Sequence, residues 1–185
     1  MELLDIVDEK GLPTGEVIDR GIAHEKGILH RTSHVWFIRK RNTIEILLQK
    51  RSRNKDSWPG YYDISTAGHI PAGVGFEESA IRECREELGI DIQKEDLLYC
   101  GYRTVYYEEQ FHGKPFIDNQ YSNVYIVNKD PESFTLQKEE VEEVIWMDFE
   151  ECKQGVLNNT FKNCIVYHEL EIIEEGLKKY ASIIR

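Results

Sequence analysis

The chain of 185 residues is 41% hydrophobic and 31% charged, which predicts a single folded domain over residues 1–185 with its own apolar core. Its formal net charge of -11 argues against nucleic-acid polymers and anionic membranes as partners, although carboxylates that hold a divalent cation would still attract a small anionic substrate. Four cysteines without metal-finger spacing predict reduced thiols, and an acidic start without an apolar leader predicts a cytoplasmic protein.

Strand signals dominate the first part of the chain. Residues 1–22 contain LLDIVDEKGLPTGEVIDRG, which predicts a β-hairpin around a Gly/Pro turn. SHVWFIRKRNTIEILLQKR predicts two neighbouring antiparallel strands that are separated by Arg41 and Asn42. YYDISTAGHI predicts one more strand, which ends in the glycine-rich loop AGHIPAGVG.

A helix is predicted from Phe76 to Leu88, because Ala80, Cys84 and Leu88 recur at helical spacing and Gly89 is a stop signal. LLYCGYRTVYY, YSNVYIV and VEEVIWMDF predict further strands, with a long acidic loop, EEQFHGKPFIDNQ, between the first two. FEECKQGVL and IVYHELEIIEEGLKKYASI, within residues 149–185, predict two closing helices. This order of elements predicts an α/β sandwich with a mixed β-sheet and an N-terminal β-hairpin.

Three glutamates share one face of the predicted helix. At about 100° per residue, Glu83, Glu86 and Glu87 lie within one arc beside the apolar stripe. Like charges at this spacing repel one another, and Arg82 should pair with only one of them, Glu86. A solvated acidic face is the simplest explanation of such a triplet. The glycine-rich loop at residues 68–75 favours a second explanation, a Mg²⁺ or Mn²⁺ site that bridges to substrate phosphates.

The loop and helix at residues 68–90 resemble the Nudix box. Gly68, followed by RECREELGI up to Ile90, matches the composition and the register of that motif. The resemblance implies a Nudix-type α/β/α sandwich and a Mg²⁺ site, with Mn²⁺ as the alternative ion. It implies that the metal ligands are Glu83, Glu86 and Glu87. It also implies that Glu86 or Glu87 orders or deprotonates the attacking water, and that Arg82 orients the carboxylates.

One position departs from the box. Val74 stands where the family pattern has its first glutamate, six residues after Gly68. The missing side chain usually supports the metal site in this family. Either Glu77 or Glu78 therefore replaces it, or metal binding is weaker.

The similarity to one branch of the family covers most of residues 1–150. LHRTSHVWF, LLQKRSRNKDSWPG, DISTAGHIPAG and FTLQKEEV resemble the Nudix subgroup related to isopentenyl-diphosphate isomerase. The isomerases transfer a proton at an allylic carbon and carry a cysteine immediately before a Gly-His pair. In this chain Ala67 precedes Gly68 and His69, so the resemblance implies hydrolysis rather than isomerisation.

Three histidines resemble the residues that bind a metal in the isomerases, namely His24, His30 and His69. The acidic pair that completes the isomerase site falls on Asp118 and Gln120, so one ligand is lost. Hydrogen-bonded structural histidines are the simpler interpretation, and a secondary or vestigial metal site is the alternative.

Two further groups of residues are candidates for substrate contact and for proton transfer. Arg51 and Lys55 match positions that contact the substrate diphosphate in the isomerases, and a solvated basic loop is the alternative. Gly68 should let the backbone lie close to the substrate. Glu140, in LQKEEVEEVIW, is the candidate for an external general base, because Nudix hydrolases often carry an acid there; a solvated acidic turn is the alternative.

These residues predict a Mg²⁺-dependent hydrolase that cleaves the phosphoanhydride linkage of a small nucleotide-like substrate, with nucleoside diphosphate derivatives as the favoured class. An isomerase that has replaced its cysteine and a non-catalytic Nudix-fold binding module are the alternatives. The identity of the diphosphate and the oligomeric state stay open, and a homodimer is one option.

Overall fold

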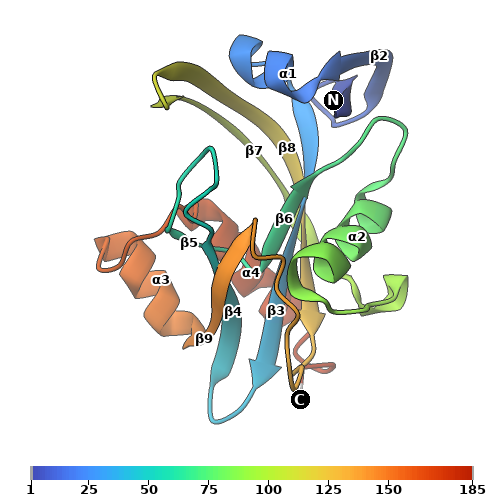
Figure 1. Cartoon of the computed structure of the whole chain (residues 1–185). Coiled ribbons are helices and arrows are strands. Elements are labelled where there is room, and N and C mark those ends of the chain that lie inside the picture. The colour runs from blue at the N-terminus through green and yellow to red at the C-terminus, as the bar shows by residue number, and fades with distance from the viewer. Residues whose placement is uncertain (1, 185) are drawn as a thin grey trace.

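The computed structural model describes residues 2–184 and contains a mixed sheet with helices on both of its faces (Figure 1). The main sheet has the order β5 (Tyr62–Asp63), β4 (Ile44–Arg51), β3 (His30–Lys40), β8 (Lys114–Asn128) and β7 (Leu98–Phe111). In addition, β6 (Thr66–His69) pairs with β3, and β9 (Val141–Asp148) pairs with β4. Strands β3 and β8 run parallel and the other pairs are antiparallel, so the predicted α/β fold with a mixed sheet is confirmed.

The predicted N-terminal hairpin is also confirmed, with β1 (Leu3–Val7) paired antiparallel to β2 (Pro13–Asp19). A short helix that the sequence had not predicted, α1 (Arg20–Lys26), follows directly. The Asp19 side chain caps it by accepting hydrogen bonds from two backbone N–H groups, and Gly27 ends it in the left-handed conformation with φ 65°. Seven residues are too few to show a helical repeat of apolar side chains.

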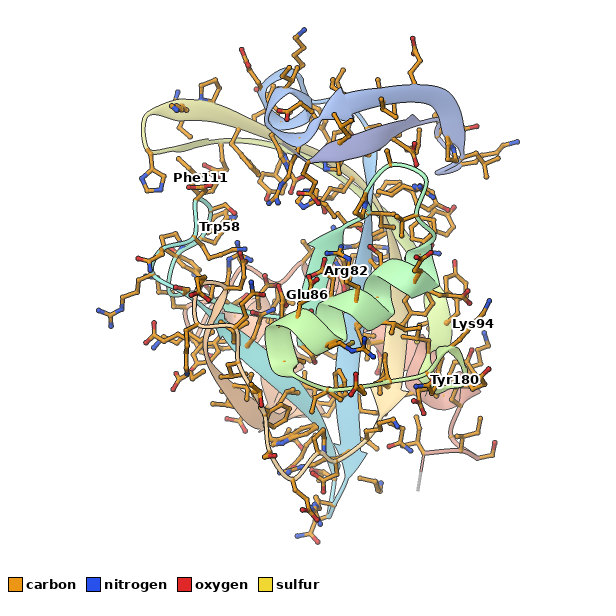
Figure 2. The ribbon with its side chains drawn as sticks, turned by 45° about the vertical axis from the view of Figure 1, so that its right-hand side comes forward. Trp58, Arg82, Glu86, Lys94, Phe111 and Tyr180 are labelled. Carbon is orange, nitrogen blue, oxygen red and sulfur yellow. The ribbon has the colours of Figure 1, made fainter. Side chains whose placement is uncertain are left out.

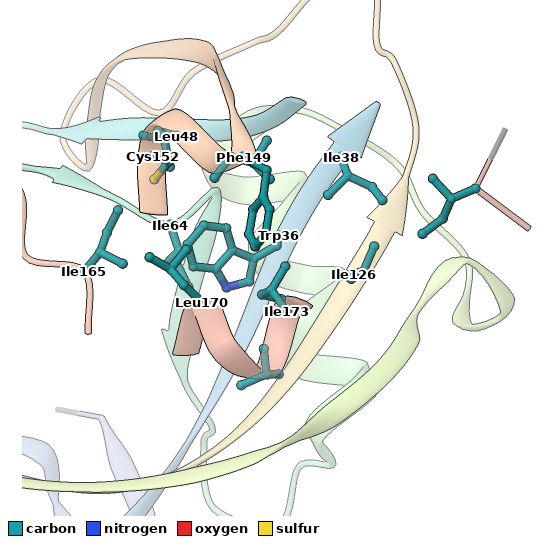
Figure 3. Packing of buried hydrophobic residues seen from close by; sticks show 13 residues of the cluster. Trp36, Ile38, Leu48, Ile64, Ile126, Phe149, Cys152, Ile165, Leu170 and Ile173 are labelled. Carbon is teal, nitrogen blue, oxygen red and sulfur yellow. The ribbon is translucent and has the colours of Figure 1, made fainter. Parts of the chain in front are cut away.

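Strand β3 contributes to two separate cores because its side chains alternate between the two faces of the sheet. Val35 and Phe37 pack in a cluster with apolar side chains of α2 (Phe76–Leu88). Trp36 and Ile38 pack in the opposite cluster, shown in Figure 3, with side chains of α3 (Phe149–Asn158) and α4 (Tyr167–Lys179). The two predicted closing helices therefore cover the face opposite α2.

Helix α2 has the predicted bounds. Ala80, Cys84 and Leu88 are fully buried in the cluster on its side of the sheet. Gly89 adopts φ 69° and donates its N–H to the carbonyl groups of the last turn, which ends the helix as expected. A 3-10 turn, η1 (Lys94–Asp96), then leads into β7.

The long acidic loop predicted around EEQFHGKPFIDNQ is wrong. Strands β7 and β8 continue through it as a hairpin arm, in which Phe111 pairs with Lys114 across the two-residue turn His112-Gly113. Both turn residues have positive φ, 52° and 74°, as a tight hairpin turn requires. The segment has a polar sequence because much of the arm is exposed, and Figure 1 shows it reaching past the loop between β4 and β5.

The single strand predicted at YYDISTAGHI is divided into β5 and β6, which pair with different neighbours. Ser65, between them, donates its hydroxyl to the Leu47 carbonyl and accepts from the Phe37 N–H. These bonds compensate for the interrupted ladder. Within the described residues, no helix combines the length and the apolar composition needed to cross a bilayer.

Candidate functional site

A cleft of about 970 Å³ lies between α2, the β7–β8 arm and the loop that joins β4 to β5. Strands β3 and β6 form its floor, and the segment before β9 forms another wall. Figure 2 shows Arg82 and Glu86 on the side of α2 that borders the cleft, and Trp58 beside Phe111 at its rim. The rings of Trp58 and Phe111 are 5.6 Å apart, so the loop and the arm meet there.

All three glutamates of the box line this cleft. Glu86 is the exposed member, whereas Glu83 and Glu87 are only 9% and 6% exposed. Glu87 accepts hydrogen bonds from the hydroxyl of Thr66, at 2.6 Å, and from the amide of Gln49, at 3.0 Å. These two neighbours hold the Glu87 carboxylate in place, and no sequence pattern had indicated either of them.

Burial changes the acidity of the two inner carboxyl groups. It raises the pKa of Glu83 to about 7, against the opposing effect of the Arg82 guanidinium. It also raises the pKa of Glu87 to about 7, with a further contribution from the negative charge of Glu83 and an opposing one from the Thr66 hydroxyl. Two buried carboxylates of this kind need a neighbouring cation to ionise fully. Hard oxygen donors on one helix face fit Mg²⁺ or Mn²⁺.

Arg82 connects two of the three carboxylates. Its Nη1 donates to Glu86 at 3.0 Å and its Nη2 donates to Glu83 at 2.6 Å, so the expectation that it would pair with Glu86 alone is wrong. The planar guanidinium carries donors on two separate nitrogens and can therefore bind two acceptors at once. Nη2 also donates to the His69 carbonyl and the Ser79 hydroxyl, which fixes the side chain.

Gly68 explains why the box loop can lie so close to α2. A Cβ atom at this position would overlap the side chain of Glu83. The absence of a side chain therefore lets the Glu83 carboxyl group rest against the strand.

The departure at Val74 is not compensated by either of the two neighbouring glutamates. Neither Glu77 nor Glu78 lines the cleft, and Glu77 pairs instead with Lys94 at 2.7 Å. The Val74 carbonyl accepts a hydrogen bond from Arg31. The first glutamate of the motif thus has no replacement from Glu77 or Glu78.

The two candidate diphosphate contacts, Arg51 and Lys55, both line the cleft. Arg51 already donates to the Ser57 carbonyl and to the Asp63 carboxylate, at 3.1 Å. Lys55 forms an ion pair with Glu140. A phosphate would have to replace one partner of Lys55, Glu140, but two partners of Arg51.

The structure divides the acidic run before β9 into two pairs. Glu139 and Glu140 line the cleft, and the ion pair with Lys55 brings the Glu140 carboxylate to the cleft wall. Glu142 and Glu143 lie outside it, where both contact Lys50. Glu140 is therefore positioned to reach groups bound in the cleft.

The three histidines singled out in the sequence converge at the α1 end of the cleft. One ring nitrogen from each of His24, His30 and His69 lies within 4.8 Å of the others. His24 and His69 share a hydrogen bond of 3.0 Å, and His30 bonds the Ile28 carbonyl.

The surroundings of this cluster fit a cation. Nδ1 of His24, Nε2 of His30 and Oδ1 of Asp118 are buried without a hydrogen-bond partner among residues 2–184. Burial is the main cause that lowers the pKa of all three histidines, that of His24 to about 4, so the rings are neutral and able to act as ligands. Nitrogen donors with one carboxylate suit Zn²⁺ or Mn²⁺.

The sheet also contributes polar residues to the cleft that were not expected to belong to the site. His34 and Arg103 both border the cleft, and both contact Glu169 of α4, which lies 135 and 66 positions further along the chain, respectively. The one signal in the sequence is HRTSH at the start of β3, where polar side chains stand in a buried strand. Their partners lie far away along the chain, so no local pattern identifies them.

Comparison with known proteins shows the family. The model of the NUDIX domain matches residues 29–164. Nudix hydrolase 3 of Arabidopsis thaliana is 41% identical over 81% of the chain, but the chain spans only 20% of that protein. An uncharacterized Nudix hydrolase of Clostridium acetobutylicum is 37% identical, with 81% of this chain and 71% of the relative covered.

More distant matches agree with this assignment. Isopentenyl-diphosphate Delta-isomerase of Escherichia coli is 26% identical, with 82% of this chain and 79% of the isomerase covered. A solved structure from Deinococcus radiodurans shares the fold with a TM-score of 0.65 and 20% identity, over 88% of this chain and 92% of that one. Because the domain model covers the main sheet from the end of α1 through β9 and includes the box helix, the chain belongs to the Nudix family.

Proposed function

We propose that the chain is a Mg²⁺-dependent hydrolase that cleaves the phosphoanhydride linkage of a small nucleotide-like diphosphate. The observation that supports this most directly is the pair of buried carboxylates, Glu83 and Glu87, that face the same cleft as Lys55 and Arg82. Buried like charges are unfavourable without a cation, and cationic side chains beside them favour an anionic substrate.

Each residue of the site has a proposed role. Mg²⁺ bound by Glu83, Glu86 and Glu87 would neutralise the diphosphate and lower the pKa of an attacking water. Arg82 orients Glu83 and Glu86 through its two nitrogens. The hydrogen bonds that hold Glu83 and Glu86 to the same guanidinium support these roles.

Lys55 and Glu140 are proposed to act together. Their ion pair lies in the cleft, where a substrate phosphate would compete with Glu140 for the Lys55 ammonium group. A phosphate that binds Lys55 therefore releases the Glu140 carboxylate, which then accepts the proton of the attacking water. Arg51 is the second proposed phosphate contact, and it would have to give up part of its present bonding to Ser57.

Aromatic side chains in the cleft support a nucleotide-like substrate. Trp58, Phe111 and Phe116 line it, and Phe111 contacts both of the others. Such faces stack on planar bases. Nucleoside diphosphate derivatives are therefore the proposed substrate class.

Isomerisation of an allylic diphosphate is the alternative chemistry, and the relationship to the isomerases is its basis. Ala67 borders the cleft where a cysteine thiol would be needed, and alanine has no proton to transfer. Gln120 likewise lines the cleft in place of an acid. Both substitutions favour hydrolysis.

A library of nucleoside diphosphates, diphosphate sugars, dinucleotides and isopentenyl diphosphate, incubated with Mg²⁺, tests the proposal. Release of phosphate, or of a nucleoside monophosphate, is the expected result. Interconversion of isopentenyl and dimethylallyl diphosphate would establish the isomerase instead. Calorimetric binding without turnover of any compound would establish a ligand-binding module.

A further inference from the structure

The sheet carries a row of polar side chains where it lines the cleft, and we call this part of the cleft the inner wall. His69, Thr32, Ser122 and Arg103 form one row across β6, β3, β8 and β7. At about 4.8 Å per strand, the row places Arg103 roughly 14 Å from the box loop. That span accommodates a diphosphate and one further ring-sized group.

Arg103 is the residue in this row with an unused donor. It lines the cleft and is only 8% exposed. Its Nε donates to Glu169 at 2.6 Å, whereas its Nη1 is buried without a partner in the described part of the chain. A buried donor without a partner costs free energy, and a ligand that accepts from it removes this cost.

Glu169 fixes the position and the charge of Arg103. It is 1% exposed and accepts hydrogen bonds from His34 at 2.9 Å and Trp36 at 2.8 Å as well as from Arg103. Burial alone would raise the pKa of Glu169, but attraction to His34 and Arg103 outweighs it and lowers the pKa to about 2. The carboxylate thus remains ionised and compensates the Arg103 charge.

Because Glu169 already balances the charge of Arg103, the guanidinium favours a neutral hydrogen-bond acceptor over a phosphate group. The Asp118 carboxylate also borders this part of the cleft and would repel another anion. Gln120, which donates to Asp118, adds an amide to the same wall. Hydroxyl groups suit these surroundings because each one accepts from an arginine or an amide and donates to a carboxylate.

We infer that the inner wall binds a sugar attached to the diphosphate, with Arg103 as the residue that recognises its hydroxyl groups and Glu169 as the residue that positions Arg103. The inference rests on the proposed function and narrows its substrate class to diphosphates that carry a sugar on this side. A hydrocarbon group would leave the polar wall without partners.

The first experiment compares kinetics on two probes, ADP-ribose and ethyl diphosphate, with Mg²⁺. Arg103→Met should raise KM for ADP-ribose by about 10- to 100-fold with little change in kcat, because it removes hydrogen bonds to the bound sugar. Hydrolysis of ethyl diphosphate should stay within about twofold of the parent. Arg53→Met, which removes an arginine outside the cleft, should leave both reactions unchanged. For an Arg103→Met protein that keeps the parental circular dichroism spectrum, equal losses on both probes, or none on either, would overturn the inference.

Two further variants separate sugar binding from folding. Gln120→Leu leaves the Arg103–Glu169 pair intact and should also raise KM for ADP-ribose alone, even if Arg103→Met does not fold. Glu169→Gln should raise the same KM without lowering kcat, which a general loss of structure would not do. An ADP-ribose KM that neither variant changes would contradict the assignment.

Calorimetry with the methylene-bridged analogue of ADP-ribose distinguishes this inference from the proposed function. If the parent binds the analogue at least about tenfold more tightly than Gln120→Leu but hydrolyses no diphosphate, the sugar site stands and the hydrolase proposal fails. If the parent hydrolyses diphosphates but does not bind the analogue, the hydrolase proposal stands and the sugar site is overturned.

Discussion

The Glu83 carboxyl group lies so close to Gly68 that a single methyl group on Gly68 would overlap it. The contact joins the loop half of the box to its helix half. A glycine is needed there for space, and its backbone angles are not in the left-handed region. The position of a proposed metal ligand thus depends on a residue that carries no functional group.

Gly68→Ala should weaken Mg²⁺ binding and turnover together, each by at least about tenfold, because the displaced Glu83 no longer faces the other carboxylates. Titration of the hydrolysis rate with Mg²⁺ gives both quantities. Gly75→Ala is the matched control, since a Cβ at Gly75 meets nothing within 4 Å. A Gly68→Ala variant with the parental half-saturation point would show that Glu83 does not contribute to the site.

Glu86→Gln and Glu87→Gln should each lower turnover by at least about a hundredfold, because each removes a ligand charge from the metal site. Excess chelator should abolish activity, and Mg²⁺ or Mn²⁺ should restore it. Glu78→Gln, on the same helix but outside the cleft, is the control and should behave like the parent. Full activity of the parent in chelator would rule out this mechanism.

The box helix could be predicted to the residue because its signals are local. Its apolar side chains recur within one helix, and Gly89 ends it with its own conformation. The two-residue hairpin turn at His112-Gly113 could not be predicted, because the arm has no continuous apolar face to mark it as a pair of strands. Polar strands that border a cleft resemble loops in sequence.

In the site, too, contacts within one helix could be predicted from the sequence, and contacts between distant segments could not. Glu83, Glu86 and Glu87 lie within one turn and a half of helix, so their shared face follows from helical geometry alone. Arg103 and Glu169 are brought together by the packing of α4 on β7, over 66 residues of chain. No periodicity within either element indicates that contact.

The histidine cluster is expected to bind one divalent transition ion independently of the box. Co²⁺ added to the apo-protein should give visible absorption, because neutral imidazole rings converge on one point with unpartnered nitrogens. His30→Ala should remove the absorption. Glu87→Gln should retain it, and His168→Ala, at an exposed histidine of α4, should behave like the parent. A parent spectrum without absorption bands would favour three structural histidines.

Glu169 should make the stability of the fold sensitive to acid. Its pKa in the folded chain, about 2, is below the ordinary value of 4.5, so the stabilisation is complete above pH 4.5 and is lost as the pH falls toward 2. The difference corresponds to about 3 kcal/mol of unfolding free energy. Urea unfolding of the parent across this range should show that loss, and Glu169→Gln should be less stable at neutral pH with a flatter dependence. The exposed Glu171→Gln supplies the control, and parallel curves for the parent and Glu169→Gln would refute the assignment.

Glu140→Gln tests the external general base. If Glu140 accepts the proton of the attacking water, this variant should lower turnover by roughly 10²- to 10⁴-fold and leave the Mg²⁺ half-saturation point nearly unchanged. A box ligand should instead lose both quantities together. Glu142→Gln is the matched control, because Glu142 belongs to the same acidic run but pairs with Lys50 outside the cleft.

The ion pair between Glu140 and Lys55 gives a second criterion. Lys55→Met should raise KM for the diphosphate, whereas Glu140→Gln should lower kcat, since Lys55 binds phosphate and Glu140 moves a proton. A Glu140→Gln protein that turns over like the parent would return the role of base to Glu86 or Glu87.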